Sequence, residues 1–324
     1  MFRRGRRLRD TAIIRDLVRE NELSVKDFIL PIFVVEGENI KREISSLKGN
    51  YHWSVDRLGE LVKELKETGV RSVIIFGVPE HKDCKGTEAY NENGIVQKAI
   101  RKLRELDDEL YIITDVCMCE YTNHGHCGIL HGKSIDNDET LEYLGKIALS
   151  HAKAGAHMIA PSDMMDGRIG YIRKVLDDNG FKMTPIMSYA AKYASGFYGP
   201  FREAAGSAPQ FGDRKGYQMD PANSREAMLE IEADINEGAD IIMVKPAMSY
   251  LDIVREARNR YDVPLCVYNV SGEYAMVKNA GEVGLIDEKR VALEMLISMK
   301  RAGAKMIMTY YALEAARWLK EDNN

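Results

Sequence analysis

Three cysteines lie close together in the segment DVCMCEYTNHGHCG, which runs from Asp115 to Gly128, and these are Cys117, Cys119 and Cys127. Thiolates are soft ligands that suit zinc, and three of them on one short loop can occupy three corners of a tetrahedron. The fourth corner is either left for water or substrate, or closed by His124 or His126. The spacing therefore predicts a bound divalent metal, with zinc as the default.

Two other interpretations of the cysteines are weaker. The chain has 5 cysteines, an odd number, and no secretory segment, which disfavours a disulfide. An iron–sulfur cluster would usually need four thiolates, and only three cluster here.

Lys245 is the second residue with chemical potential, because four apolar residues precede it and a proline follows. A lysine held at the mouth of a folded cavity is partly desolvated, which favours the neutral amine that can form a Schiff base with a ketone. The alternative is a lysine that extends from a strand end into solvent. Lys192 on its own is weaker evidence, since a loop lysine is usually solvated. Two amines facing one cavity would lower each other's pKa, so the pair is the stronger indication.

Residues from about 193 to 219 form a glycine-punctuated, aromatic and basic segment that includes Tyr198, Arg202 and Arg214. Long loops in compact domains are usually functional, and arginine suits carboxylates. We therefore expect a lid that closes over a small anionic substrate, most naturally a carboxylate.

A repeated pattern indicates the elements that must position these residues. In each repeat an amphipathic stretch ends at a glycine and a short apolar run follows, as in residues 68–76, 154–160, 237–244 and 302–308. A glycine at that place stops a helix, and a continuous apolar strand is typical of a parallel sheet covered on both faces.

Further apolar runs bring the number of strands to about eight, at residues 28–35, 110–116, 184–189 and 264–270. Helices lie between most of them. This count predicts an α/β fold, a (β/α)8 TIM barrel, over residues 28–324. Residues 1–27 lie outside this pattern, as a solvated tail or as an extended N-terminal arm that makes oligomer contacts with a neighbouring subunit. No Gly-x-Gly-x-x-Gly follows a strand, which weakens a dinucleotide-binding function.

In such barrels the active residues come from the carboxyl ends of the strands. That rule selects a set of residues spread over the sequence: Asp115, Ser162, Tyr189, Lys192, Lys245, Ser271 and Tyr310.

The composition of the chain limits the classes of partner that it can bind. The net charge of −5 makes general nucleic-acid binding improbable, although the start of the chain is arginine-rich. Acidic residues follow that start too soon for a transit peptide, and no apolar run reaches membrane-spanning length. We expect a protein of the reducing cytoplasm that binds neither nucleic acid nor membrane.

The chain resembles the 5-aminolevulinate dehydratase (porphobilinogen synthase) family over nearly its whole length. The resemblance rests on GADIIMVKPAMSY from Gly238 to Tyr250, on the cysteine loop, and on the lid with Arg202 and Arg214. It implies a lyase that condenses two 5-aminolevulinate molecules to a pyrrole in tetrapyrrole (haem) biosynthesis. It also implies a barrel and a homo-octamer whose arms embrace neighbouring subunits.

The resemblance also implies roles for individual residues. Lys245 would form a Schiff base with the substrate that supplies the propionate side of the pyrrole, and Lys192 would hold the second substrate as an imine. Zinc on the cysteines would polarise the second carbonyl or activate water. The remaining matches are Arg202, Arg214 and Gln218 for the second carboxylate, Ser271 and Tyr310 for the first, Asp115 and Ser162 for an amino group, and Tyr189 and Tyr198 for the pocket wall.

Metal dependence differs within the family. Some members replace the cysteines and work without zinc, whereas this chain retains all three and so resembles the zinc-dependent type. Certain bacterial members bind allosteric magnesium through a glutamate fifteen positions before the Schiff-base lysine, a position that Glu230 occupies here. A single glutamate on a helix face is more often simply solvated.

Three alternatives differ in class. A class I aldolase would share the barrel and the strand-end lysine but would need no metal. A non-catalytic barrel with a structural zinc would leave the lid arginines unexplained. A nucleic-acid-binding protein using the basic start would bind with a steep salt dependence.

Overall fold

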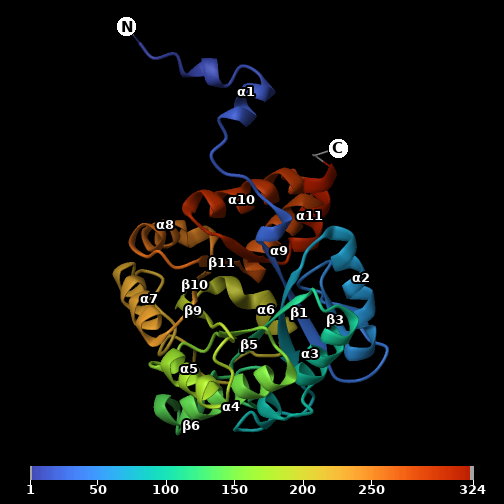
Figure 1. Ribbon diagram of the computed structural model, residues 1–324, viewed down its shortest axis with the longest axis vertical. Coiled ribbons are helices and arrows are strands. Elements are labelled where there is room, and N and C mark those ends of the chain that lie inside the picture. The colour runs from blue at the N-terminus through green and yellow to red at the C-terminus, as the bar shows by residue number, and fades with distance from the viewer. Residues whose placement is uncertain (1, 322–324) are drawn as a thin grey trace.

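The computed structural model describes residues 2–321, and within them eight parallel strands form a barrel. Their order around the barrel is β8-β5-β4-β1-β12-β11-β10-β9 (Figure 1). The barrel strands are β1 Phe28–Val35, β4 Ser72–Val78, β5 Tyr111–Val116, β8 Met158–Pro161, β9 Met187–Lys192, β10 Ile241–Lys245, β11 Leu265–Asn269 and β12 Met306–Thr309. The predicted (β/α)8 fold is confirmed.

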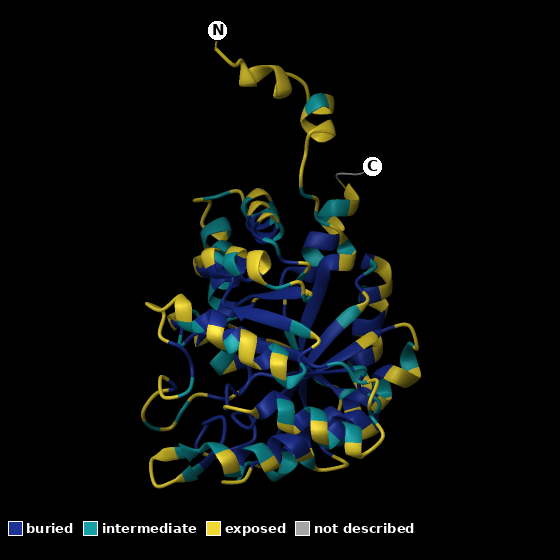
Figure 2. Cartoon of the chain, turned by 60° about the vertical axis from the view of Figure 1, so that its left-hand side comes forward, coloured by how far each residue is buried: buried dark blue, intermediate teal, exposed yellow. Residues whose placement is uncertain are grey.

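Helices cover the outside of the barrel. The long ones are α2 Leu58–Thr68, α3 Ile95–Leu106, α4 Asn137–Ala154, α5 Arg168–Asp178, α7 Arg225–Glu237, α8 Leu251–Arg260, α9 Ser271–Glu282, α10 Glu288–Ala302 and α11 Ala312–Glu321. Their inner faces and the strands are buried, while their outer faces are exposed (Figure 2). Because both faces of each strand are covered, the strands are continuously apolar, and all residues of β1 are buried.

The four glycines of the sequence repeat end helices as predicted. Gly69, Gly155, Gly238 and Gly303 follow α2, α4, α7 and α10 and have φ of +81°, +105°, +107° and +127°. These values lie in the region that glycine adopts without a steric penalty, so the chain can reverse there and enter the next strand.

The barrel closes unevenly. Seven neighbouring strand pairs share a parallel ladder, with a register shift between β9 and β10, whereas β8 and β9 are joined in the described residues by one isolated bridge, Ile159 to Ile186. That bridge lies near the amino-terminal ends of the two strands. Their carboxyl ends, where the candidate site residues lie, therefore have to be held together by side chains.

Short strands and helices lie between the main elements of the barrel. β2 Lys41–Glu43 pairs with β3 Tyr51–Ser54, which adds to the end of β1, and β6 Ile129–His131 pairs with β7 Ser134–Asp136 after the cysteine loop. The segment predicted as a lid contains the short helices η5 Gly196–Tyr198 and α6 Gly199–Ala204, and the other short helices are η3 Val55–Arg57, η4 Thr87–Tyr90 and η6 Met248–Tyr250.

The first residues of the chain extend away from the barrel. They carry η1 Gly5–Leu8 and α1 Ala12–Leu17, neither of which contains a buried residue, and η2 Val25–Asp27 leads into β1. Figure 1 shows this arm reaching past α10, with α1 clear of the barrel. Within residues 2–321, no helix combines the length and apolarity that crossing a membrane requires.

Candidate active site

Two lysines end neighbouring strands at the mouth of the barrel. Lys192 is the last residue of β9 and Lys245 the last of β10, and they are register partners. Both are buried, with 4% and 5% of their surface exposed. The alternative in which Lys192 is a solvated loop lysine does not hold, because β9 continues beyond Tyr189 to Lys192 and the side chain is buried. The two amines therefore lie at the same level of the barrel, in the space at its mouth that we call the chamber.

Aromatic rings surround the amine of Lys245. Its Nζ lies 4.2 Å from the ring centre of Tyr268, 5.1 Å from those of Tyr189 and Phe201, and 5.3 Å from that of Tyr198. These rings come from two strands and the lid, so the lid closes the chamber over the amine. Such rings exclude water while tolerating a positive charge on the nitrogen.

Burial makes the amine of Lys245 nucleophilic near neutral pH. Desolvation, followed by repulsion from Lys192, lowers the pKa of Lys245 to about 7, although the carboxylate of Asp115 opposes the shift. A lysine in that range is substantially neutral under ordinary conditions, and the neutral amine is the form that attacks a carbonyl.

Asp115 and Ser162 lie beside the lysines. The amine of Lys192 donates a hydrogen bond to the carbonyl oxygen of Ser162 and lies 5.6 Å from the ring centre of Tyr189. Burial, followed by repulsion from Glu120, raises the pKa of Asp115 to about 8. A carboxyl group in that state keeps its proton near neutral pH and can donate it.

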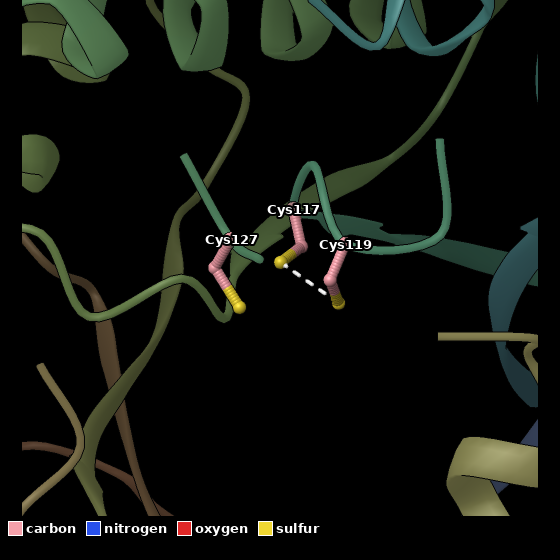
Figure 3. Close-up of side chains that lie close together, drawn as sticks. All are labelled: Cys117, Cys119 and Cys127. Carbon is pink, nitrogen blue, oxygen red and sulfur yellow. Dashed lines mark hydrogen bonds between the residues drawn. The ribbon is translucent and has the colours of Figure 1, made fainter. Parts of the chain in front are cut away.

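The three predicted metal ligands converge. The sulfur atoms of Cys117, Cys119 and Cys127 all lie within 4.8 Å of one another, and the side chains are buried (Figure 3). The Sγ atoms of Cys117 and Cys119 are 3.4 Å apart. Burial is the first cause that raises the pKa of the Cys117 thiol, whereas hydrogen bonds from Cys117 and Cys119 lower the pKa of Cys127. A bound cation would stabilise all three sulfur atoms as thiolates. The donor set and its compactness fit zinc.

The two histidines of the loop serve other contacts. The ring nitrogens of His126 lie 3.2 Å from the hydroxyl of Tyr217 and 3.0 Å from the carbonyl oxygen of Phe211. The Nδ1 atom of His124 accepts a hydrogen bond from the amide of His126. Among the described residues, the group of possible ligands around the sulfur atoms consists of the three cysteines.

Lid residues bring unpartnered polar atoms to the same chamber. Arg214 donates hydrogen bonds to the carbonyl oxygens of Gly125 and Ser207, 2.9 and 2.5 Å away, and so fixes the lid on the cysteine loop. Throughout residues 2–321, the Nε atoms of Arg202 and Arg214 and both amide atoms of Gln218 are buried without a hydrogen-bond partner. Each such group costs about 1–3 kcal/mol, so together they indicate a polar ligand at this place.

Ser271 and Tyr310 lie on the Lys245 side. The hydroxyl of Ser271 accepts from the amide of Phe201 at 3.0 Å and donates to the carbonyl oxygen of Phe197 at 3.3 Å, so it holds the lid. The hydroxyl of Tyr310 lies 2.8 Å from that of Tyr268. The hydroxyl of Tyr198 donates to the carbonyl oxygen of Tyr193 at 2.7 Å.

Glu230 lies apart from the lysines. It is half-buried in a pocket of about 470 Å³ whose acidic lining residues also include Asp166, Asp213 and Glu226. Burial raises its pKa, against the attraction of Arg168. Gln218 is also among the residues that line this pocket.

Sequence reasoning missed several residues of the site. Tyr268 lies one position before a strand end, so the strand-end rule could have found it. Glu120 is buried with a carboxylate oxygen 3.2 Å from the Sγ atom of Cys119, and its place inside the cysteine loop was the available signal. Arg168 and Asp234 have no local signal, because only the fold brings them together.

Comparisons with known proteins agree with this geometry. Residues 2–318 match the family model described as delta-aminolevulinic acid dehydratase. The chain is 55% identical over 320 residues to the delta-aminolevulinic acid dehydratase of Bacillus subtilis, covering 99% of both chains. It is 53% identical to that of Staphylococcus aureus, covering 98% of this chain and 99% of the relative.

A solved structure is similar over the whole fold. The delta-aminolevulinic acid dehydratase (porphobilinogen synthase) of Toxoplasma gondii, in complex with the reaction product porphobilinogen, superposes with a TM-score of 0.97 at 43% identity. The match covers 99% of this chain and 93% of that one.

Proposed function

The chain belongs to the delta-aminolevulinic acid dehydratase (porphobilinogen synthase) family and condenses 5-aminolevulinate to porphobilinogen in tetrapyrrole biosynthesis, and we propose that Lys245 and Lys192 do this through Schiff bases beside a zinc ion. The observation that carries the proposal is the pairing of two buried lysine amines, in register on β9 and β10, within one chamber. The family assignment sets aside the aldolase, the non-catalytic barrel and the nucleic-acid-binding protein.

Lys245 is suited to bind the first substrate. Its neutral amine attacks the ketone carbon, and the oxygen leaves as water when the carbon–nitrogen double bond forms. The aromatic rings around the amine exclude bulk water, which would otherwise hydrolyse the imine. In this proposal Ser271 and Tyr310 hold the carboxylate of this substrate, which requires the hydroxyl of Ser271 to turn from its contacts with the lid.

Lys192 is suited to hold the second substrate as an imine. Arg202, Arg214 and Gln218 offer unpartnered donors for its carboxylate, and a carboxylate would satisfy them. Asp115 and Ser162 orient the amino group of the first substrate between the lysines, and Tyr189 and Tyr198 line the pocket. With its raised pKa, Asp115 can supply a proton to a departing hydroxyl group.

Zinc is assigned to Cys117, Cys119 and Cys127 because their sulfur atoms form a compact, buried group. When bound there, zinc would supply Lewis acidity to a substrate oxygen at the fourth corner. The chain's own contribution is to hold the thiols buried and to place Arg214 over the loop that carries them.

Three further assignments are also proposals. Glu230, in its acidic pocket, is the candidate ligand for an allosteric magnesium ion. Residues 1–27 act as an oligomerisation arm of a homo-octamer, and residues 28–324 form the catalytic barrel with a lid at about 193–219. The retained thiols suit the reducing cytoplasm.

The test uses full-length, reduced protein stripped of metal with a chelator and then given zinc. Pyrrole formation from 5-aminolevulinate should appear only after zinc returns. Cys119→Ala should lower it by a factor on the order of a hundred, because metal polarisation of a carbonyl contributes several kcal/mol. The matched control is Cys84→Ala, which removes an exposed thiol outside the cluster and should change little.

Two results would overturn parts of the proposal. Full activity in verified zinc-free protein would remove zinc from the reaction. The absence of any adduct on Lys245 after borohydride reduction with substrate, in protein that makes porphobilinogen, would remove its Schiff base.

A further inference from the structure

An arginine is buried beneath the lysine pair. Arg168, the first residue of α5, is 2% exposed and is among the largest fully buried side chains of the described residues. Its guanidinium donates to Asp234 of α7 through a bidentate pair of 3.1 and 3.0 Å. It also donates to the hydroxyl of Ser188 at 3.1 Å and to the carbonyl oxygen of Tyr189 at 3.2 Å, both on β9.

A second acidic side chain meets the same guanidinium from the loop after β8. The Oδ1 atom of Asp163 lies 3.8 Å from the Nε atom of Arg168, and Asp163 is fully buried directly after Ser162. Arg168 therefore contacts the loop after β8, the amino-terminal half of β9 and α7. A single cation joins three elements that are distant in the sequence.

A buried ion network of this kind is weak evidence for stability. Taking charges out of water costs several kcal/mol per ion, and well-packed apolar groups often stabilise a fold as well or better. What a bidentate arginine adds is fixed geometry, since its planar fork accepts partners in one arrangement.

The network lies at the one seam of the barrel that the backbone leaves weak. Between β8 and β9, the part of the chain that the structure describes has a single bridge, Ile159 to Ile186, near their amino-terminal ends. Beyond it, Lys192 bonds to the carbonyl oxygen of Ser162 across the seam. Arg168 contacts both segments, through the carbonyl oxygen of Tyr189 on β9 and, after β8, through the side chain of Asp163 and the carbonyl oxygen of Met165.

Lys245 does not depend on this seam. β10 pairs with β11 in a regular ladder in which Ile242, Met243 and Val244 face residues 265–267. The pairing of β10 with β9, in contrast, shifts register between Ile242 and Val244. Relative to its outer neighbour β8, β9 is therefore less constrained by the sheet than β10 is relative to β11.

We propose that Arg168 is a positioning residue for Lys192, holding β9 to the loop after β8 so that this amine reaches the second substrate. The inference rests on the proposed function, in which Lys192 and Lys245 bind different substrates. It predicts that loss of Arg168 harms the Lys192 half of the reaction and spares the Lys245 half.

The experiment compares Arg168→Lys with Arg173→Lys in the zinc-loaded, full-length enzyme. Arg173 lies on the same helix and also bonds to backbone, donating to the carbonyl oxygens of Phe181 and Thr184 at 2.9 and 2.6 Å, but these residues lie in the loop before β9. Each protein is mixed with 5-aminolevulinate and borohydride, and peptide mass spectrometry measures the reduced adduct on each lysine separately.

In Arg168→Lys, the ratio of Lys192 adduct to Lys245 adduct should fall about tenfold or more, together with kcat, since misplacement of a reacting group by about 1 Å is sufficient for such a loss. Arg173→Lys should keep the wild-type ratio. If Arg168→Lys does not fold, Ser188→Ala removes one bond of the network and should lower the ratio in the same direction.

An unchanged ratio in the folded variants, or an equal fall of both adducts, would overturn the positioning role. A wild-type enzyme without adduct on either lysine would instead overturn the proposed function, and this inference with it.

Discussion

Single side chains in the chamber acquire their chemistry from burial. Exposed lysines are protonated at neutral pH and cannot attack a ketone. At Lys245 desolvation and the neighbouring charge of Lys192 remove that obstacle, whereas Asp115 becomes a proton donor by the same desolvation. The pairing of the two lysines therefore matters chemically, because the charge of Lys192 lowers the pKa of Lys245.

Imine formation on Lys245 should follow the pKa of about 7. Below that pH the amine is protonated, so the initial rate of borohydride-trapped adduct should fall about tenfold per pH unit, and above it the rate should level off. The measurement is site-resolved mass spectrometry of quenched single-turnover samples over a pH series.

A charge variant should move this midpoint. Lys192→Met removes a repelling cation and should move it to higher pH. A wild-type midpoint near 10, the ordinary lysine range, would show that burial does not tune this amine.

At the scale of elements, the lid and α9 act together. The amide of Phe201 in α6 bonds to Ser271, the first residue of α9, and the ring of Phe201 covers the amine of Lys245. The same ring packs edge-on against Phe76 of β4, with 5.0 Å between ring centres. The closed chamber therefore depends on how closely the lid approaches the start of α9.

Gly272→Ala should open this contact. A Cβ atom at Gly272 would lie 2.5 Å from the carbonyl oxygen of Phe197 and 2.9 Å from its Cα, and backbone atoms so close must move. We expect a higher KM for 5-aminolevulinate and activity lowered about tenfold, with a stability cost of about 1–3 kcal/mol from overpacking. Steady-state kinetics and thermal unfolding measure the two effects.

The matched control is Gly199→Ala. Gly199 lies in the same lid with a helical φ of −50°, and an added Cβ meets no atom within 4 Å. Its kinetics should remain those of the wild type. Equal effects of the two substitutions would mean that lid mobility, rather than the approach at Gly272, controls the site.

At the scale of the whole molecule, the N-terminal arm stands out because its two short helices bury no residue against the barrel. Phe2, Ile13 and Leu17 are 74–76% exposed, and α1 is too short to be stable alone in water. Apolar side chains on a segment that leaves its own barrel indicate a surface that another subunit covers.

Deletion of residues 1–18 should leave a folded barrel that forms smaller assemblies. None of the removed residues that the structure describes is buried, so the thermal unfolding of the barrel itself should change little. Sedimentation velocity measures the assembly. Ile13→Asp with Leu17→Asp should act in the same direction, whereas Asp16→Asn on the same helix should not. A truncated chain that sediments as the full-length assembly would contradict the role of the arm.

The sequence by itself determined the features that depend on nearby residues. Apolar runs of strand length, helices stopped by Gly69, Gly155, Gly238 and Gly303, and the spacing of three cysteines are local, because each depends on backbone conformation or ligand reach within a few residues. Those signals were sufficient for the barrel, the thiol cluster and Lys245.

Only the tertiary structure decided how the strand ends meet. That Lys192 ends β9 in register with Lys245, that Tyr268 and Phe201 face one amine, and that Arg168 spans the seam follow from packing between distant segments. A buried charge such as Arg168 looks like any surface arginine in the sequence. Its role becomes evident only where the fold removes it from water and surrounds it with partners.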